Sequence, residues 1–155
     1  MFDLGRRGLI LATLALAACG GGGAPMPGGL DRNGLYPNET PELRARINYW
    51  SRQYQVPSAM VQRIILRESQ HRPGARNGSY YGLMQISHAT ARGMGYSGEP
   101  SGLLDAETNL RYAVRYLAGA YVTAKGNPDQ AMRFYARGYY YDAKRAGVLR
   151  QAGLR

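Results

Sequence analysis

The chain has 155 residues and a formal net charge of +10, from 20 Lys and Arg against 10 Asp and Glu. This length bounds the protein to one domain with a hydrophobic core and terminal segments. Cys19 is the single cysteine, which excludes an internal disulfide and a multi-cysteine metal site. The basic charge favours a polyanionic partner, although an arginine-rich composition alone accounts for it equally well.

The first twenty residues have the layout of a secretory signal. Arg6 and Arg7 precede an apolar stretch at residues 9–18 that is too short to span a bilayer comfortably. Four glycines follow Cys19, which argues against a buried helix here. The sequence LAAC resembles a bacterial lipobox, in which the cysteine is lipidated and becomes the first mature residue. We therefore expect a signal peptide at residues 1–18 and a lipid anchor at Cys19.

Residues 19–39 are rich in Gly and Pro and predict a flexible tether, which is followed by one domain at residues 40–155. Gly20 stands where an aspartate is the usual retention signal, so the lipobox resemblance implies the outer membrane, facing the periplasm. An exported chain rarely meets nucleic acid. The expected polyanion is therefore a polymer of the cell envelope.

Two helices are predicted at the start of the domain. Thr40 is a suitable N-cap and Pro41 suits a first helical turn. The apolar face of this first helix consists of Leu43, Ile47 and Trp50. The second helix begins near Pro57, and Glu68 continues its apolar stripe. That stripe consists of Val61, Ile64 and Ile65.

A loop and a short strand are predicted next. The loop covers residues 70–82, and YYGLMQI at residues 80–86 is the one credible strand. Ser87 or His88 caps a short helix that follows the strand.

The C-terminal half is predicted to be helical. A long helix runs from its cap Asp105 to a stop at Gly126, and Asn127 caps the next helix. The apolar stripe of the long helix consists of Leu110, Ala113, Val114, Leu117 and Tyr121. A last helix is predicted from about residue 142 to residue 151. The expected fold is a single, mainly α domain.

Glu68 is the candidate catalytic acid. A carboxylate on a buried stripe loses water when the domain folds, which disfavours its charged form and suits proton transfer to a leaving group. The alternative is a Glu at a helix end that simply turns outward to water. No Asp or Glu occurs at residues 69–98, although Glu99, Asp105 or Asp129 could approach through the fold.

Several motifs around Glu68 have a specific spacing. They are Glu68-Ser69, Pro73, Ala75, GLMQI at residues 82–86, Thr90-Ala91, Asn109-Leu110, Tyr116-Leu117 and Tyr135. Together, over residues 41–140, they resemble the soluble lytic transglycosylase family, a relative of goose-type lysozyme. The resemblance implies a lysozyme-like helical domain with a small strand and loop region at the cleft.

The resemblance also implies a reaction, the cleavage of peptidoglycan between N-acetylmuramic acid and N-acetylglucosamine. The catalytic glutamate of the family falls on Glu68, protonates the glycosidic oxygen and then activates the sugar's own 6-hydroxyl, which gives a 1,6-anhydro product. Ordinary glycosidases need two carboxylates. One carboxylate suffices where the substrate supplies the nucleophile, which agrees with the acid-free stretch after Glu68.

Five further residues are candidates for the substrate site by resemblance. Gln85 would hydrogen-bond the glycan, although a structural bond to the backbone is an equal alternative. Met84 would line the cleft or belong to the core. Tyr135 would lie close to the glutamate, Ser69 would orient the helix end, and Asn77 falls where many members carry a serine that touches an acetamido group.

The sequence departs from the family at one motif and carries no metal-ligand pattern. The family's Tyr-Asn-Ala-Gly reads YARG at residues 135–138, which puts the cleft-shaping role of this motif in doubt. His71 and His88 lack metal-ligand spacing, so we expect them at the surface or in loops and expect neither a metal nor another cofactor.

Three functions remain open from the sequence. The first is a membrane-tethered lytic transglycosylase, with peptidoglycan glycan strands as partner and a monomeric state. The second is a hydrolytic muramidase on the same fold, and the third is a weakly active, wall-binding lipoprotein.

Overall fold

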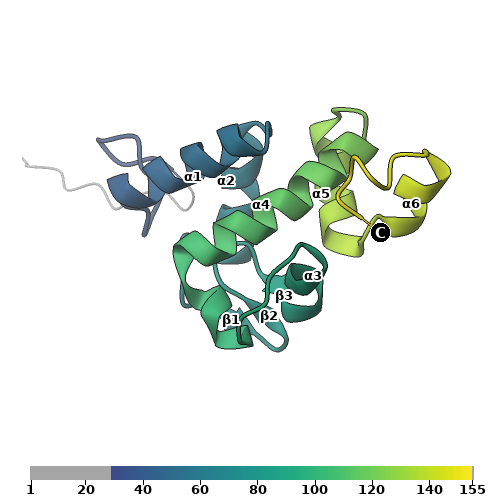
Figure 1. Cartoon of the computed structure of the whole chain (residues 1–155). Coiled ribbons are helices and arrows are strands. Elements are labelled where there is room, and N and C mark those ends of the chain that lie inside the picture. Colours follow the sequence, from purple (N-terminus) through teal and green to yellow (C-terminus); the bar gives the residue numbers. More distant parts are fainter. Residues whose placement is uncertain (1–28, 155) are drawn as a thin grey trace, which may run out of the picture.

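The computed structural model describes residues 29–154 (Figure 1). The predicted signal peptide and the lipidation site Cys19 lie outside this range. Among the residues described, no helix combines the length and the apolar character that a membrane crossing requires.

The described chain is mainly helical, as predicted, with one small sheet. The elements are α1 (Pro41–Gln53), α2 (Ser58–Glu68), β1 (Arg76–Asn77), β2 (Tyr80–Tyr81), β3 (Ile86–Ser87), α3 (His88–Gly93), a 3-10 helix (Pro100–Leu104), α4 (Ala106–Thr123), α5 (Pro128–Arg137) and α6 (Tyr140–Arg145).

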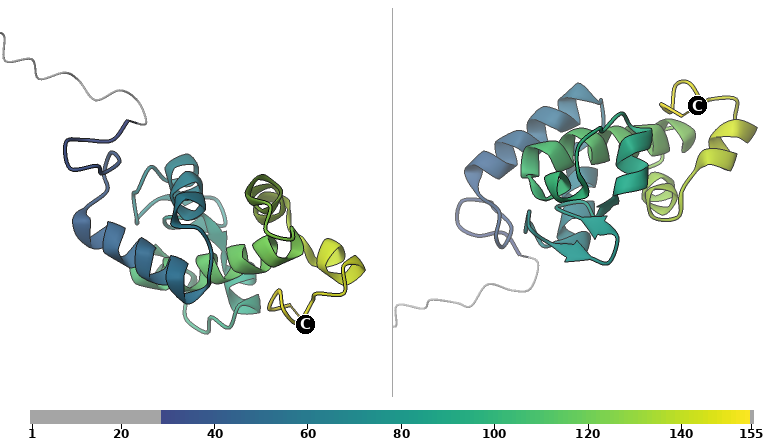
Figure 2. Two further views of the ribbon diagram at one scale, coloured as in Figure 1. Left: turned by 90° about the horizontal axis from the view of Figure 1, so that it is seen from above. Right: turned by 60° about the horizontal axis from the view of Figure 1, so that its bottom comes forward.

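Helix α4 runs through the centre of the molecule and organises the core (Figure 1). It contacts α1, α3, α5 and the 3-10 helix. In Figure 1 the helices α1 and α2 lie on one side of α4, and the small sheet with α3 lies on the other; the right view of Figure 2 again shows α1 and the sheet on opposite sides of α4. The predicted stripe of α4 is inaccessible to solvent except for Tyr121, which is half-buried. The domain therefore folds around the longest of the described helices, whose apolar stripe the sequence predicts.

Four of the predicted helix starts are confirmed by their caps. The side chains of Thr40, Ser87, Asp105 and Asn127 each accept a hydrogen bond from the backbone N–H three residues later. Each cap satisfies a donor that the first helical turn leaves without a partner. These signals are local, which is why the sequence alone located them.

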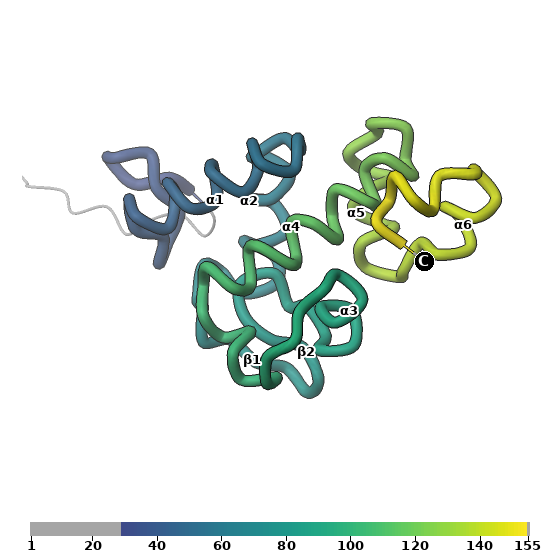
Figure 3. Tube along the Cα trace, in the orientation of Figure 1, coloured from purple at the N-terminus to yellow at the C-terminus, as the bar shows by residue number. Residues whose placement is uncertain are grey.

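The single strand predicted at residues 80–86 is wrong. The structure has three antiparallel two-residue strands in the order β1-β2-β3, in which Asn77 pairs with Tyr80 and Tyr81 pairs with Ile86. Residues 82–85 form the turn between β2 and β3, and Gly82 has a positive φ of 73°. Figure 3 shows the segment that carries β1 and β2 beneath α4, where the chain folds back on itself. The apolar run GLMQI therefore packs as a turn, which periodicity cannot reveal.

Two boundaries at the C-terminal side also differ from the predictions. The long helix α4 ends at Thr123, three residues before the expected stop at Gly126. The last helix runs from Tyr140 to Arg145 instead of from residue 142 to 151, and turns replace its second half from Gly147, where φ is 69°. A residue with a positive φ leaves the right-handed helical path, and glycine adopts this conformation at little cost because it has no Cβ atom.

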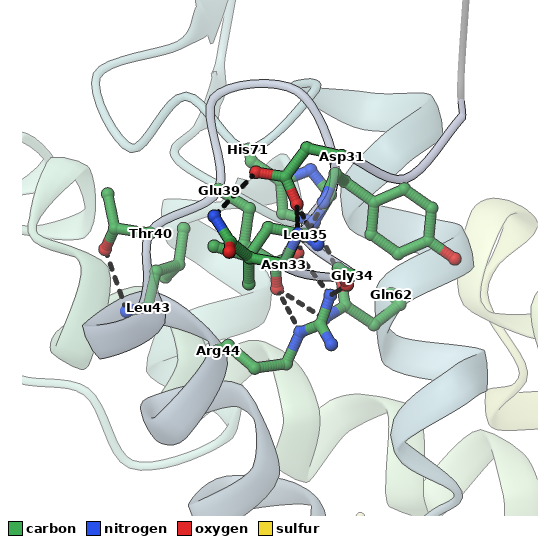
Figure 4. A network of polar contacts seen from close by, with 11 residues as sticks. Asp31, Asn33, Gly34, Leu35, Glu39, Thr40, Leu43, Arg44, Gln62 and His71 are labelled. Carbon is green, nitrogen blue, oxygen red and sulfur yellow. Dashed lines mark hydrogen bonds and ion pairs between the residues drawn. The ribbon is translucent and has the colours of Figure 1, made fainter.

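The segment 31–39, which the composition predicts to belong to a flexible tether, packs on the domain (Figure 4). Glu39 is the centre of this contact, and its side chain is inaccessible to solvent. Its carboxylate accepts hydrogen bonds from the Arg44 Nε and Nη2 atoms, from Gln62 Nε2 at 2.6 Å and from the Tyr36 backbone N–H at 3.0 Å. Burial opposes ionisation of Glu39, but these hydrogen bonds outweigh it and hold its pKa below the usual value.

His71 lies in a loop, as expected, but it is fully buried and not at the surface. Its Nε2 atom lies 2.6 Å from Gln62 Oε1, and its ring stacks on Tyr36 with a centroid separation of 5.3 Å. Because the Gln62 amide donates to Glu39, its oxygen must accept from His71, so Nε2 carries the proton. The buried Nδ1 atom has no hydrogen-bond partner among the described residues. Burial lowers the pKa of His71, and the Glu39 charge opposes this only in part.

Stability is expected to fall as the pH drops below 6.5, the ordinary pKa of histidine. In this window the unfolded chain binds a proton at His71 that the folded chain excludes, so the free energy of unfolding rises with pH by at most about 1.4 kcal/mol per unit. Chemical denaturation at several pH values measures the slope. The variant His71→Phe should be less stable at pH 7.5 yet show a flatter dependence, and an unchanged slope would assign the proton to another group.

Candidate active site

The candidate site is a pocket of about 240 Å³ at the end of α2. It is lined by Glu68, Asn77, Tyr80, Gln85, Tyr135 and Ala136. These residues come from α2, the sheet and α5, so the pocket exists only because three distant parts of the chain meet. Of the predicted site residues, Glu68, Asn77, Gln85 and Tyr135 are brought together here.

Glu68 is the last residue of α2, and its side chain is 28% exposed. Glu68 is therefore neither fully desolvated, as its position on the apolar stripe predicts, nor turned fully outward to water. One carboxylate oxygen, Oε1, accepts from the Nε and Nη2 atoms of Arg67 at 2.9 and 2.7 Å. The other oxygen, Oε2, has no hydrogen bond to the described residues and is available to a ligand.

The three other acids considered from the sequence do not join Glu68. Asp105 caps α4, Glu99 precedes the 3-10 helix, and Asp129 forms an exposed ion pair with Arg63 at 3.2 Å. Of the described residues that line the pocket, Glu68 is therefore the one carboxylate.

Gln85 makes the structural bonds to the backbone that the sequence left as one of two alternatives. Its Nε2 atom donates to the backbone oxygens of Ala75 and Gly82 at 3.1 and 2.9 Å, which closes the turn. Its backbone has a positive φ of 48°, an unusual conformation for a residue other than glycine. The amide oxygen accepts no hydrogen bond from the described residues, and Gln85 lines the pocket. One end of Gln85 is structural, and the other is open to a ligand.

Asn109 holds the turn against α4, a role that the sequence did not reveal. Its fully buried amide donates to the backbone oxygens of Tyr81 and Leu103 at 2.8 and 2.9 Å and accepts from the Met84 N–H at 3.0 Å. The position of Asn109 in the sequence could have indicated this role, because Asn109 lies four residues before Ala113 on the buried face of α4. A polar residue on such a face needs buried partners.

Tyr135 connects α5 to the same turn. Its hydroxyl donates to the Met84 backbone oxygen at 2.9 Å, and its ring lies 5.4 Å from that of Tyr116. Burial raises the pKa of Tyr135 well above its usual value, and the negative charge of Glu68 acts in the same direction. Tyr135 is therefore a neutral hydrogen-bond donor beside the carboxylate.

Ser69 and Met84 lie behind the pocket wall. Ser69 is buried, and its hydroxyl donates to the Ile65 backbone oxygen at 3.2 Å, which fixes the end of α2. The Met84 side chain is inaccessible to solvent and belongs to the core. In this structure both side chains support the pocket from inside and do not line it.

The variant Tyr135→Phe is expected to lose about 1 kcal/mol of stability and to lower kcat on the natural substrate. The Met84 carbonyl would lose its donor, and the turn that carries Gln85 would lose its link to α5. Thermal denaturation and steady-state kinetics measure the two effects. Tyr96→Phe is the control, because its hydroxyl also donates to a backbone oxygen, that of Glu99 at 2.7 Å, but away from the pocket. Equal kinetic losses in both variants would contradict a role for Tyr135 at the site.

The pocket continues into a second hollow of about 230 Å³ along α5. The two share Tyr80, Gln85, Tyr135 and Ala136. The second hollow adds Ser87 and Thr90, whose hydroxyls lie 2.8 Å apart. We call the two hollows together the cleft. Its open, elongated form and its hydroxyl, amide and tyrosine lining suit a polar chain with ring faces, such as an oligosaccharide.

Comparison with known proteins agrees with this geometry. The model of one family, described as Transglycosylase SLT domain, matches residues 45–147. That range includes Glu68, the turn with Gln85, Asn109 and Tyr135, and it covers most of the chain. The comparisons with curated proteins and with solved structures gave no match. The chain therefore belongs to the SLT transglycosylase domain family, whose members are lysozyme-like enzymes that act on peptidoglycan.

Proposed function

We propose that this protein cleaves the β-1,4 bond between N-acetylmuramic acid and N-acetylglucosamine and leaves 1,6-anhydro ends. The observation that carries this proposal is the solitary carboxylate of Glu68 in a cleft that suits a glycan. Glycosidases that add water use a second carboxylate as nucleophile or base. The single carboxylate in the pocket favours a nucleophile that the substrate itself supplies.

Glu68 performs both proton transfers in this proposal. The protonated acid gives its proton to the glycosidic oxygen as the bond from C1 to that oxygen breaks, which releases the N-acetylglucosamine end as an alcohol. The carboxylate then takes the proton of the muramic acid 6-hydroxyl while O6 bonds to C1. Glu68 ends protonated as it began, and no water is consumed.

Other residues of the cleft are assigned to holding the glycan. The free amide oxygen of Gln85 accepts from an acetamido N–H or a hydroxyl, and the exposed Asn77 amide offers both donor and acceptor. Tyr80 is 53% exposed in the wall and offers a ring face to a sugar. Tyr135, kept neutral, holds the turn while the charge on Glu68 changes.

The mass of the products tests this function. Purified peptidoglycan is digested with the protein, and the released muropeptides are weighed. Anhydro ends lack the mass of one water relative to hydrolysed ends. Products with hydrolysed ends would establish a muramidase instead, and no release at all would leave a binding protein.

We also propose that the protein acts in the cell envelope, anchored by a lipid at Cys19 and facing the periplasm from the outer membrane. The lipobox-like LAAC sequence supports this, together with the Gly20 that follows it. A lipid anchor would place the cleft near the glycan strands.

A further inference from the structure

A third pocket, which we call the α6 pocket, adjoins the cleft. It measures about 530 Å³ and is lined mainly by residues from the end of α5 and from α6, two elements that Figure 1 labels side by side. Tyr116, Arg137 and Gly138 line both this pocket and the cleft. A branched ligand bound in the cleft can therefore extend into the α6 pocket without leaving the protein surface.

The α6 pocket carries a net positive charge from two arginines that share one carboxylate. Arg137 Nη1 lies 3.0 Å from one oxygen of Asp142, and Arg145 Nη2 lies 2.7 Å from the other. The arginine side chains are 56% and 71% exposed. Each guanidinium has five N–H donors, so most of them remain for a ligand. Exposed ion pairs are weak, and an incoming anion competes with them easily.

Aromatic side chains form the other part of this pocket. Tyr140 and Tyr141 are 42% and 72% exposed, and their rings meet edge to face with centroids 5.4 Å apart. Exposed rings beside guanidiniums suit a ligand that combines carboxylates with aliphatic groups. An acidic peptide has this chemistry, whereas an uncharged sugar makes no use of the two arginines.

We propose that the α6 pocket binds the peptide branch of peptidoglycan and that Arg137 pairs with one of its carboxylates. This inference rests on the proposed function, since the glycan in the cleft carries the branch. Arg137 directly follows Ala136, which lines the pocket of Glu68, so a branch beside the scissile bond lies within reach. Arg137 also stands where the family motif has an alanine, so its charge is a departure of this chain from that motif.

Two substrates and a matched pair of variants test the inference. Intact peptidoglycan is compared with glycan strands from which an amidase has removed the peptides. Arg137→Gln should lower kcat/KM about tenfold more on the intact substrate than on the stripped strands, because one charge-assisted contact to the peptide is lost. Arg137→Lys should keep part of the activity, and added salt should shrink the difference from wild type. The control is Arg133→Gln on the same helix, whose guanidinium hydrogen-bonds Gln130.

Other outcomes decide against the inference. An equal loss of kcat/KM on both substrates would show that Arg137 contacts the sugar or its lactyl group instead of the peptide. No loss on either substrate would show that Arg137 has no role in binding. If wild type released nothing from either substrate, the proposed function would fail. Titration with the free stem peptide would then still test the inference. The inference predicts that the peptide binds more weakly to Arg137→Gln than to wild type, and equal affinities would contradict it.

Discussion

Replacement of Glu68 by glutamine is expected to reduce the release of muropeptides by about 1,000-fold or more. Glutamine keeps the shape of the side chain but neither gives up nor accepts a proton at the glycosidic oxygen. General acid and base steps each contribute about 100-fold to 10,000-fold, and Glu68 is proposed to perform both. The measurement is the initial rate of muropeptide release from purified peptidoglycan, with products identified by mass.

The fold should tolerate this change. Glu68 is partly exposed, and its ion pair with Arg67 lies at the surface, where such pairs contribute little to stability. Asp129→Asn is the matched control, because Asp129 also pairs with an exposed arginine, Arg63, but lies outside the cleft. Glu68→Gln with wild-type activity would refute the mechanism, and an equal loss in Asp129→Asn would trace the defect to charge or folding.

Local signals made the helices predictable from the sequence. Thr40, Asp105 and Asn127 act through hydrogen bonds to residues three positions away, and the apolar stripes follow a period that any helix must have. These features need no knowledge of the rest of the chain. The mainly α fold and the position of Glu68 at the end of α2 follow from them.

Contacts between distant residues account for what the sequence did not reveal. The β-turn at residues 82–85 depends on Asn109, which is 25 residues away from Met84, and Gln62 reaches Glu39 across 23 residues. Two-residue strands have no periodicity, and a polar residue shows no partner in a linear sequence. The burial of His71 and the packing of segment 31–39 were missed for the same reason. The YARG sequence marked a departure at Arg137, but only the structure places that arginine between two pockets.

Replacement of Asn109 by leucine is the second change with a large expected effect. Leucine has nearly the same size, so the core keeps its volume while three hydrogen bonds disappear. The Met84 N–H and the oxygens of Tyr81 and Leu103 would be left buried without this partner. Each such group costs about 1 to 3 kcal/mol, so we expect a loss on the order of 4 kcal/mol. Since domains of this size are stable by about 5 to 15 kcal/mol, the variant should fold but melt early.

A second variant, Gly82→Ala, changes the same turn but keeps the Asn109 side chain in the core. In Gly82→Ala the new Cβ atom would lie 2.3 Å from Asn109 Nδ2 and 2.4 Å from the Leu103 oxygen, at a φ of 73° that favours glycine. Both variants should therefore displace the same turn, and with it Gln85. We expect both to lose activity as well as stability, when activity is measured at a temperature at which each variant remains folded. Denaturant titration and kinetics on the same samples measure both quantities. A destabilised Asn109→Leu that keeps the wild-type kcat would show that the turn does not position the site, because the hydrogen bonds would then serve stability alone.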